Sequence, residues 1–345
     1  MMKPLKAKYY IIPSALCLLL ILGMGYYYFL TSLSPSDQVQ YLYIDDDDTT
    51  DSVFAKLAPM ATPHAMTGLR TLARHKHYDR YLHTGRYAIT PGENALTTFS
   101  KLKNGQQTPI MLTVPESRTM DRLAATLARK LMIDSAAIAE TLADTLSYVD
   151  WGIADYDTCS LPSLFVPNTY EVYWNISPSQ LMQRMIKEHD RFWDGERTAK
   201  ASALGLTVNQ VCTLASIIDE ETANVGEKPM IAGMYLNRLK QDMPLQADPT
   251  VKFAMKNFGA RRIYYDMLTF DSPYNTYRNT GLPPGPIKIA SVKGIDAVLN
   301  AVQHDYLYMC AKEDFSGTHN FATTYQEHLQ NAARYSKALN QRGIK

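Results

Sequence analysis

One long apolar segment near the start constrains this chain more than any other feature. It runs from Tyr9 to Leu30 and has tyrosines at both ends. About 20 apolar residues are enough for a helix to cross a bilayer, and tyrosines are typical of the membrane interfaces. We therefore expect a single transmembrane helix over residues 9–31.

The charges beside this segment predict its orientation. Lys3, Lys6 and Lys8 precede it, and basic residues flank membrane helices on the cytoplasmic side. Residues 1–8 are therefore expected to form a cytoplasmic tail, and the chain after the helix to lie on the outer, periplasmic side of the cell (inner) membrane. A cleaved signal peptide is the alternative, but the segment is longer than a typical h-region and no clean cleavage site follows it.

The balance of charges argues against a nucleic-acid partner. The 345 residues carry 35 Lys and Arg against 34 Asp and Glu, a formal net charge of +1. Nucleic-acid binding needs clustered positive charge, and the basic residues here are dispersed. The histidines show no paired-ligand spacing, and the four cysteines form no CxxC pair, so neither a metal nor a cofactor is expected.

Strand and helix patterns divide the rest of the chain into an α+β arrangement. Residues 32–39 are polar and are expected to be a linker. From 40 to 155, short strand-like stretches and Pro-Gly turns are followed by helical periodicity, which predicts small β/α units in succession. No catalytic constellation occurs there, so we interpret this region as a binding or positioning module. Residues 156–345 are expected to form a mixed α+β domain.

An apolar helix that ends in three acids, LASIIDEET (residues 214–222), is the most informative motif of that domain. Thr207 and Gln210 have the spacing of a capping box, and apolar residues recur at helical spacing from Val208 to Ile218. These features predict a helix that begins after Thr207 and carries a broad apolar face.

The three acids occupy different sides of this helix. At ~100° per residue, Glu221 falls on the side of Leu214 and Ile217. Asp219 lies at the other edge of the apolar face, and Glu220 lies nearly opposite its centre. We therefore expect Glu220 to be solvated, and Glu221 and Asp219 to be partly buried.

Burial would give one of these acids a chemical role. It raises a glutamate pKa above the ~4.3 of a free side chain, and neighbouring acids should raise it further. A glutamate that stays protonated near neutral pH can donate a proton to a leaving oxygen. We favour Glu221 as this acid and keep the shorter Asp219 as a secondary candidate. The alternative is that all three acids form an ordinary charged helix end.

Three later segments add further candidates. LQADPT suggests a helix start, with Asp248 as cap and Pro249 in the first turn. Residues 271–291 form a turn-rich loop whose prolines predict a rigid wall. YLYMCAKEDFSGTHNFATTYQEHL (residues 306–329) predicts two strands and a helix, with His319 on the second strand as a secondary candidate.

Taken in order, these motifs resemble the endolytic murein transglycosylases, also called the MltG or YceG-like family. The matching segments are LASIIDEET, IAGMYLNRL, LQADPTVKFA, SPYNTYRNTGLPPGPI, YLYMCA and GTHNF. SPYNTY followed by GLPPGPI is the most specific of them. The resemblance is tight from about residue 205 to 330 and looser back to residue 40.

The resemblance implies a membrane-anchored lyase that acts on peptidoglycan. Residues 40–155 would be a LysM-like glycan-binding module and 156–345 the catalytic domain. Glu221, directly before the Thr of the helix motif, would cleave MurNAc–GlcNAc bonds to 1,6-anhydroMurNAc ends and so terminate nascent glycan strands, with peptidoglycan synthases as partners. Gln246, Asn275 and Tyr277 would contact sugar or N-acetyl groups; loop-stabilising hydrogen bonds are their alternative role.

Two other functions remain open from the sequence. A hydrolysing muramidase would cleave the same bond with water, for which glycosidases use a pair of carboxylates. A non-enzymatic, peptidoglycan-binding membrane scaffold would need no acid at all.

Overall fold

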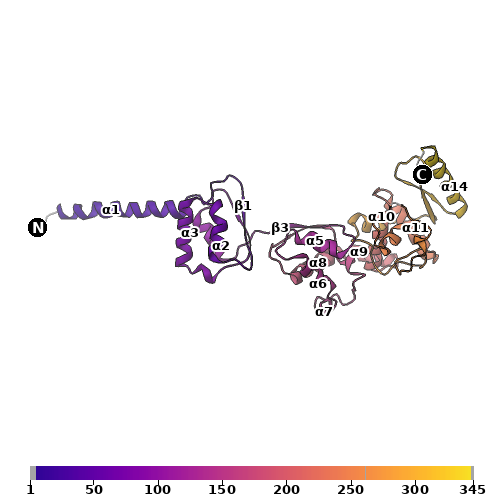
Figure 1. Cartoon of the computed structure of the whole chain (residues 1–345), viewed down its shortest axis with the longest axis horizontal. Coiled ribbons are helices and arrows are strands. Elements are labelled where there is room, and N and C mark those ends of the chain that lie inside the picture. The colour runs from indigo at the N-terminus through magenta and orange to yellow at the C-terminus, as the bar shows by residue number, and fades with distance from the viewer. Residues whose placement is uncertain (1–4, 261, 343–345) are drawn as a thin grey trace. The chain divides into compact units, whose positions relative to one another are not determined.

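The structure is a computed structural model that describes residues 5–260 and 262–342. Helices and three two-stranded sheets make up the fold, which confirms the mixed α+β class (Figure 1). The chain forms two compact units. The first contains the described residues up to Met111, with Lys130–Met132 and Glu171–Ile176; the second contains Leu112–Arg129, Ile133–Tyr170 and the described residues from Ser177 onward.

An apolar helix occupies the predicted membrane segment. Helix α1 covers Leu5–Gly25 and continues into a π-helical turn, Tyr26–Leu30. Within the described residues, Tyr10–Leu30 is the one straight helical stretch long and apolar enough to cross a membrane, with 21 residues and a mean hydropathy of 1.8. Residues 1–4 of the expected cytoplasmic tail lie outside the described residues.

In the first unit, helices α2 and α3 come between strands β1 and β2 along the chain, and the two strands pair with each other. Strand β1 pairs antiparallel with β2, with Leu42 opposite Tyr87. In β1, Leu42 and Ile44 face the core while Tyr41 and Tyr43 are exposed, as the two-residue period of a strand requires. The elements in order are β1 (Gln40–Ile44), α2 (Thr50–Leu57), α3 (Pro63–His75), β2 (Gly85–Ile89) and α4 (Ala95–Lys103).

The expected linker over residues 32–39 begins inside this unit's core. Leu33 is fully buried. Its N–H donates to the Glu93 carbonyl at 2.7 Å, and its own carbonyl accepts from the Thr62 N–H at 2.8 Å. The surrounding serines gave this stretch the composition of a linker, but one leucine with satisfied backbone groups is enough to fix its start.

The second unit contains the remaining helices and strands β5 and β6, whereas β3 and β4 each have residues in both units. Strands β3 and β4 pair with one another, and β5 pairs antiparallel with β6. The elements are β3 (Ile110–Val114), α5 (Met120–Ala128), α6 (Ser135–Ala143), α7 (Ser147–Asp150), β4 (Asn168–Val172), α8 (Pro178–Phe192), α9 (Gly195–Ala203), α10 (Val208–Glu221), α11 (Lys228–Lys240), α12 (Asp248–Ala254), α13 (Val292–Leu299), β5 (Tyr308–Ala311), β6 (His319–Ala322) and α14 (Tyr325–Gln341).

The chain first passes from one compact unit to the other at residue 112, and it returns to the first unit at Lys130–Met132 and Glu171–Ile176. Helices α5 and α6 pack against each other, and α6 packs against α8 of the second unit. The strand, turn and helix of residues 110–128 repeat the local pattern of residues 85–103. Periodicity therefore could not separate them, because the difference lies in which core each helix joins.

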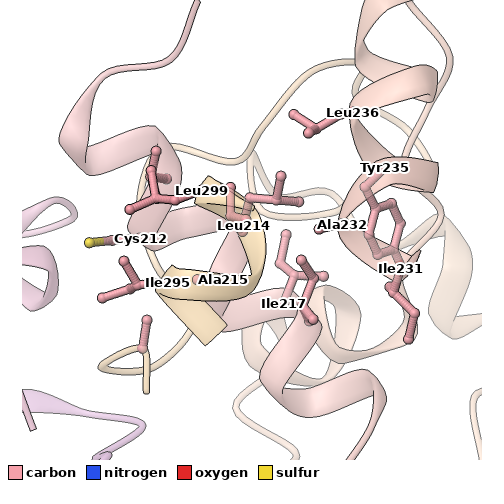
Figure 2. Packing of buried hydrophobic residues seen from close by; sticks show 14 of the residues in the cluster. Cys212, Leu214, Ala215, Ile217, Ile231, Ala232, Tyr235, Leu236, Ile295 and Leu299 are labelled. Carbon is pink, nitrogen blue, oxygen red and sulfur yellow. The ribbon is translucent and has the colours of Figure 1, made fainter. Parts of the chain in front are cut away.

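Helix α10 lies at the centre of the second unit. It begins with the predicted capping box, in which the Gln210 N–H donates to Thr207 Oγ1 at 3.2 Å and the Thr207 N–H donates to Gln210 Oε1 at 2.9 Å. In Figure 2, Leu214, Ala215 and Ile217 of α10 lie among apolar side chains of α11 and α13. Burying each large aliphatic side chain contributes about 1.5–3 kcal/mol.

This helix is buried on every side, not on one broad face as the sequence indicated. All eight residues from Val211 to Ile218 are buried, including two polar ones. The Thr213 hydroxyl donates to the Asn209 carbonyl and the Ser216 hydroxyl to the Thr213 carbonyl, each at 2.7 Å. Because both hydroxyls bond within their own helix, they can be buried at little cost.

Gly285, in the loop over residues 271–291, lies against the backbone of Cys159, and its substitution tests this contact. A Cβ added at Gly285 would lie 2.0 Å from the carbonyl oxygen of Cys159. Gly285→Ala should lower the free energy of unfolding by about 1–3 kcal/mol, since backbone must move to relieve the clash. Urea denaturation measures this. Gly195→Ala, with nothing within 4 Å of its added Cβ, is the control; equal stabilities would contradict the packing.

Candidate active site

A cavity of about 240 Å³ in the second unit contains the C-terminal end of α10. Helices α10, α11 and α12, the loop around Tyr277 and the β5–β6 hairpin all contribute to its walls. The lining residues are Glu221, Met234, Tyr235, Arg238, Leu245, Gln246, Asp248, Tyr277, Met309, Cys310, Ala311 and His319.

Glu221 is the acid of the α10 motif that faces this cavity. The Tyr235 hydroxyl donates to its Oε1 at 2.9 Å. The pKa of Glu221 is raised to about 7, chiefly by burial and in part by the Asp248 charge, while the Tyr235 hydrogen bond and the charges of Lys252 and Arg238 oppose the rise. As the last helical residue it also faces the negative end of the helix dipole, which favours the neutral form. A large fraction of Glu221 is therefore protonated near neutral pH.

Glu220 is not the solvated acid that the helix geometry predicted. Its carboxylate accepts from Arg118 Nη2 at 2.6 Å and lies 3.6 Å from Lys288 Nζ, and only 21% of its side chain is exposed. The predicted direction of Glu220, away from Leu214 and Ile217, holds; the predicted solvation does not. Residues distant in the sequence supply two cations there, and no local pattern contains that information.

Asp219 is partly desolvated as predicted, but it lies outside the cavity. It forms an ion pair with Lys228, and it accepts from the Ser291 N–H at 2.6 Å and the Ser291 hydroxyl at 2.8 Å. These bonds connect the end of α10 to the starts of α11 and α13. The acid that chiefly raises the pKa of Glu221 is Asp248, and not Asp219 or Glu220 as we expected.

Two of the expected substrate-contacting residues line the cavity with Glu221. Gln246 adopts a left-handed backbone, with φ of 51°, and its N–H donates to the Thr276 carbonyl at 3.0 Å. The Tyr277 hydroxyl donates to Asp248 Oδ1 at 2.6 Å. Burial and this hydrogen bond raise the pKa of Tyr277, so it remains a neutral donor and acceptor within the cavity.

Asn275 does not line the cavity. Its side chain is fully buried, and its amide nitrogen donates to the carbonyls of Leu268 at 2.9 Å and Phe270 at 2.8 Å. Its Oδ1 accepts from the Tyr277 N–H at 3.0 Å. These bonds match the loop-stabilising alternative: Asn275 fixes the turn that presents Tyr277.

His319 lies in the cavity wall and is oriented by a buried glutamate. Its Nδ1 is 2.9 Å from Glu227 Oε2, and its backbone N–H donates to Glu227 Oε1 at 2.6 Å. Glu227 also accepts from the Thr222 hydroxyl at 3.3 Å. A ring whose Nδ1 is held in this way presents Nε2 for other contacts.

Three cavity residues were missed or misinterpreted from the sequence. Tyr235, on α11, was not among the sequence candidates; the usable signal is that a buried tyrosine hydroxyl needs a partner. Arg238, also absent from the sequence candidates, donates hydrogen bonds to the Leu307 carbonyl at 2.6 Å and to the Leu245 carbonyl at 2.9 Å. Asp248 does not cap α12, since Ala247 occupies that position without a side-chain bond.

The cavity thus combines one carboxyl that is partly protonated at neutral pH, Glu221, with a second carboxyl, Asp248, and several fixed hydrogen-bonding groups. A neutral acid in such a polar site can transfer a proton to a leaving group and accept one back. This arrangement suits cleavage of a bond between a carbon and an oxygen.

Comparisons with known proteins agree with the motifs. A family model described as the YceG-like family matches residues 42–334. The protein named endolytic murein transglycosylase of Bacillus subtilis (strain 168) is 30% identical over 272 residues, covering 75% of this chain and 74% of the relative. A protein of the same name from Streptococcus pneumoniae (strain D39) is 27% identical over 90% of this chain, which spans only 62% of that relative's length.

A solved structure supports the same grouping. The crystal structure of a YceG-like protein from Listeria monocytogenes is 26% identical, with a TM-score of 0.54, and the match covers 86% of this chain and 99% of that one. The family model covers most of the chain, from the first strand of the first unit to the last helix of the second. The chain therefore belongs to the YceG-like family.

Proposed function

We propose that this protein is a peptidoglycan lytic transglycosylase that cleaves MurNAc–GlcNAc bonds and leaves 1,6-anhydroMurNAc ends. The observation that carries the proposal is a carboxyl in the wall of an open cavity, Glu221, whose pKa of about 7 keeps it partly protonated at neutral pH. Relatives named endolytic murein transglycosylase support the substrate class.

Glu221 serves as acid and then as base in this reaction. Its proton passes to the glycosidic oxygen, and the bond from C1 of the muramic unit to that oxygen breaks. The C6 hydroxyl oxygen of the same unit then bonds to C1, and its proton returns to the Glu221 carboxylate. No water is consumed, and the acid is protonated again for the next turnover.

The other cavity residues position the sugar and set the state of the acid. The Tyr235 hydroxyl stabilises the Glu221 carboxylate that forms after proton transfer, because a hydrogen bond favours the charged form. Gln246, Tyr277 and the Nε2 edge of His319 are the groups available to sugar hydroxyls and N-acetyl groups.

The remaining parts of the chain place this site on its substrate. Helix α1 anchors the protein in the cell (inner) membrane, with the chain after Leu30 on the outer side. The first unit, with its order β1–α2–α3–β2, serves as a LysM-like module that binds glycan. A tethered site of this kind meets strands as synthases release them, and so it ends their elongation; peptidoglycan synthases are the partners.

A hydrolysing muramidase is the second candidate, and one observation favours it. Asp248 places a second carboxyl in the same cavity as Glu221, and glycosidases that use water rely on such a pair. No feature of the cavity favours the non-enzymatic scaffold, because a scaffold does not require a protonated acid.

Glu221→Gln tests the acid. Replacing the carboxyl with an amide removes the transferable proton and should lower kcat by about 10²–10⁴-fold, the usual contribution of general acid–base catalysis. The measurement is digestion of purified glycan strands with mass spectrometry of the products, which should be anhydro ends for the wild type. Glu140→Gln, at an exposed position of α6, is the matched control.

The result can also contradict the proposal. Wild-type products that carry an added water would replace it with the muramidase. A Glu221→Gln protein that keeps wild-type activity, or a wild type that cuts no strand, would remove the role of this acid.

The pH dependence of kcat/KM should report the same carboxyl. Because Glu221 must be protonated, kcat/KM should fall by about tenfold per pH unit above a midpoint near the Glu221 pKa of about 7. Tyr235→Phe removes a hydrogen bond that lowers this pKa, so the midpoint should move to higher pH. Tyr325→Phe, an exposed tyrosine, should leave it in place. A midpoint that moves down in Tyr235→Phe would contradict this arrangement.

Asp248→Asn separates the two enzymatic candidates. Removing this negative charge should lower the pKa of Glu221, so the midpoint of the kcat/KM profile should move to lower pH. For a lytic enzyme the products should remain anhydro ends, which mass spectrometry reads directly. If the wild type instead makes reducing ends, which carry an added water, and Asp248→Asn does not, the result would show that Asp248 activates water.

A further inference from the structure

A second groove lies beside the candidate active site and differs from it in charge. Two adjoining cavities, of about 320 Å³ and 60 Å³, share Arg118 and Glu220 in their walls. We call them together the basic groove. Its charged residues are Glu116, Arg118, Arg122, Glu220, Lys252 and Lys288.

The basic groove has more positive than negative charge. Glu220 and Glu116 are its two carboxylates, and both lie against Arg118 or Lys288, with Lys288 Nζ 2.8 Å from Glu116. Arg122 and Lys252 form no ion pair with any described residue. Four cations therefore face two acids, and the two without partners can pair with an anion.

Arg118 is also held ready for a further contact. Its Nε and Nη2 donate to Glu220 at 3.4 Å and 2.6 Å, and its guanidinium lies 5.6 Å from the centre of the Phe258 ring. These contacts fix the plane of the guanidinium while its Nη1 makes no hydrogen bond to the described residues. A fixed guanidinium suits carboxylate recognition because little side-chain entropy remains to be lost.

The groove and the active-site cavity are close enough for one substrate to occupy both. Glu220 of the groove is the immediate neighbour of Glu221 on α10. Along α12, Asp248 faces the active-site cavity, whereas Lys252, one turn later, lines the groove. The Lys252 charge also lowers the pKa of Glu221, as expected for neighbouring groups.

We infer that the basic groove binds a carboxylate of the stem peptide attached to the muramic unit at the cleaved bond. The inference rests on the proposed function. In peptide-bearing strands the sugars carry no charge at neutral pH, because the lactyl carboxyl of each muramic unit is in amide linkage to the stem peptide, whereas the peptide itself carries free carboxylates. That peptide begins on the same sugar as the reacting carbon and extends by ~3.3–3.6 Å per residue, so its first residues can reach from the cavity into the groove.

The test compares two forms of one substrate. Uncrosslinked glycan strands are divided, and the stem peptides are removed from one half with an amidase, which leaves a lactyl carboxylate on each muramic unit but none at the distance of the peptide. The enzyme is the full chain, either wild type or the double variant Arg122→Ala, Lys252→Ala. Rates are measured about one pH unit below the Glu221 pKa, so that loss of the Lys252 charge, which raises that pKa, leaves the acid protonated.

Wild type should cleave the peptide-bearing strands with the higher kcat/KM. The double variant should lose about tenfold on these strands through KM, the loss expected for one charge-assisted hydrogen bond, and should match wild type on denuded strands. The control double variant Lys187→Ala, Arg191→Ala removes two exposed cations from α8 and should behave as wild type. Equal kcat/KM of wild type on both substrates, or an equal loss on both in the groove variant, would overturn the inference.

A binding measurement keeps the inference separate from the proposed activity. Calorimetry on Glu221→Gln protein should show tighter binding of a peptide-bearing disaccharide than of the same disaccharide without peptide. The difference should disappear when Arg122→Ala and Lys252→Ala are added. Equal affinities would overturn the groove assignment even if strands are cleaved. If wild type cuts neither substrate, the proposed function fails while this measurement still decides the groove.

Discussion

The arrangement of the site depends on how one helix end accommodates three consecutive carboxyls. Negative charge is unfavourable at a helix C-terminus, where the backbone carbonyls already present partial negative charge. Asp219 and Glu220 meet Lys228, Arg118 and Lys288. Glu221 has no cation within salt-bridge distance among the described residues and instead has a raised pKa. Pairing two of the acids and protonating the third limits the charge, and the protonated one is the reactive group.

The buried body of α10 makes this division of roles possible. A helix packed on all sides cannot rotate about its axis, so each acid keeps its own direction at steps of ~100°. Asp219 is directed to the starts of α11 and α13, Glu220 to the basic groove and Glu221 to the cavity. A shift of the helix by one residue would exchange these environments. The capping box at Thr207 and the core around Leu214 and Ile217 therefore act on the chemistry through helix position.

The sequence predicted what depends on local pattern. The capping box, the start of α10 and the burial of Glu221 follow from residues within one helix, and the structure contains all three. Placing Tyr277 and Gln246 near the acid came from the family motifs. Local patterns could not reveal that Arg118 and Lys288 cover Glu220, because those contacts join segments about 70 to 100 residues apart. The same limit applies to Asp248: its motif resembles a helix cap, and only the tertiary fold directs its carboxylate into the cavity.

The residue after the acid shows how termination of the helix and the site are connected. Thr222 is buried and extended, with φ of −144° and ψ of 137°, so α10 ends directly after Glu221. Its hydroxyl donates to Glu227, and Glu227 holds the His319 ring at the other wall of the cavity. A buried carboxylate between two donors keeps both in place, since losing either would leave it under-satisfied. Because Thr222 directly follows Glu221, the end of α10 sets the last helical position, which Glu221 occupies. Through the contact of Thr222 with Glu227, it also positions His319 on the other side of the cavity.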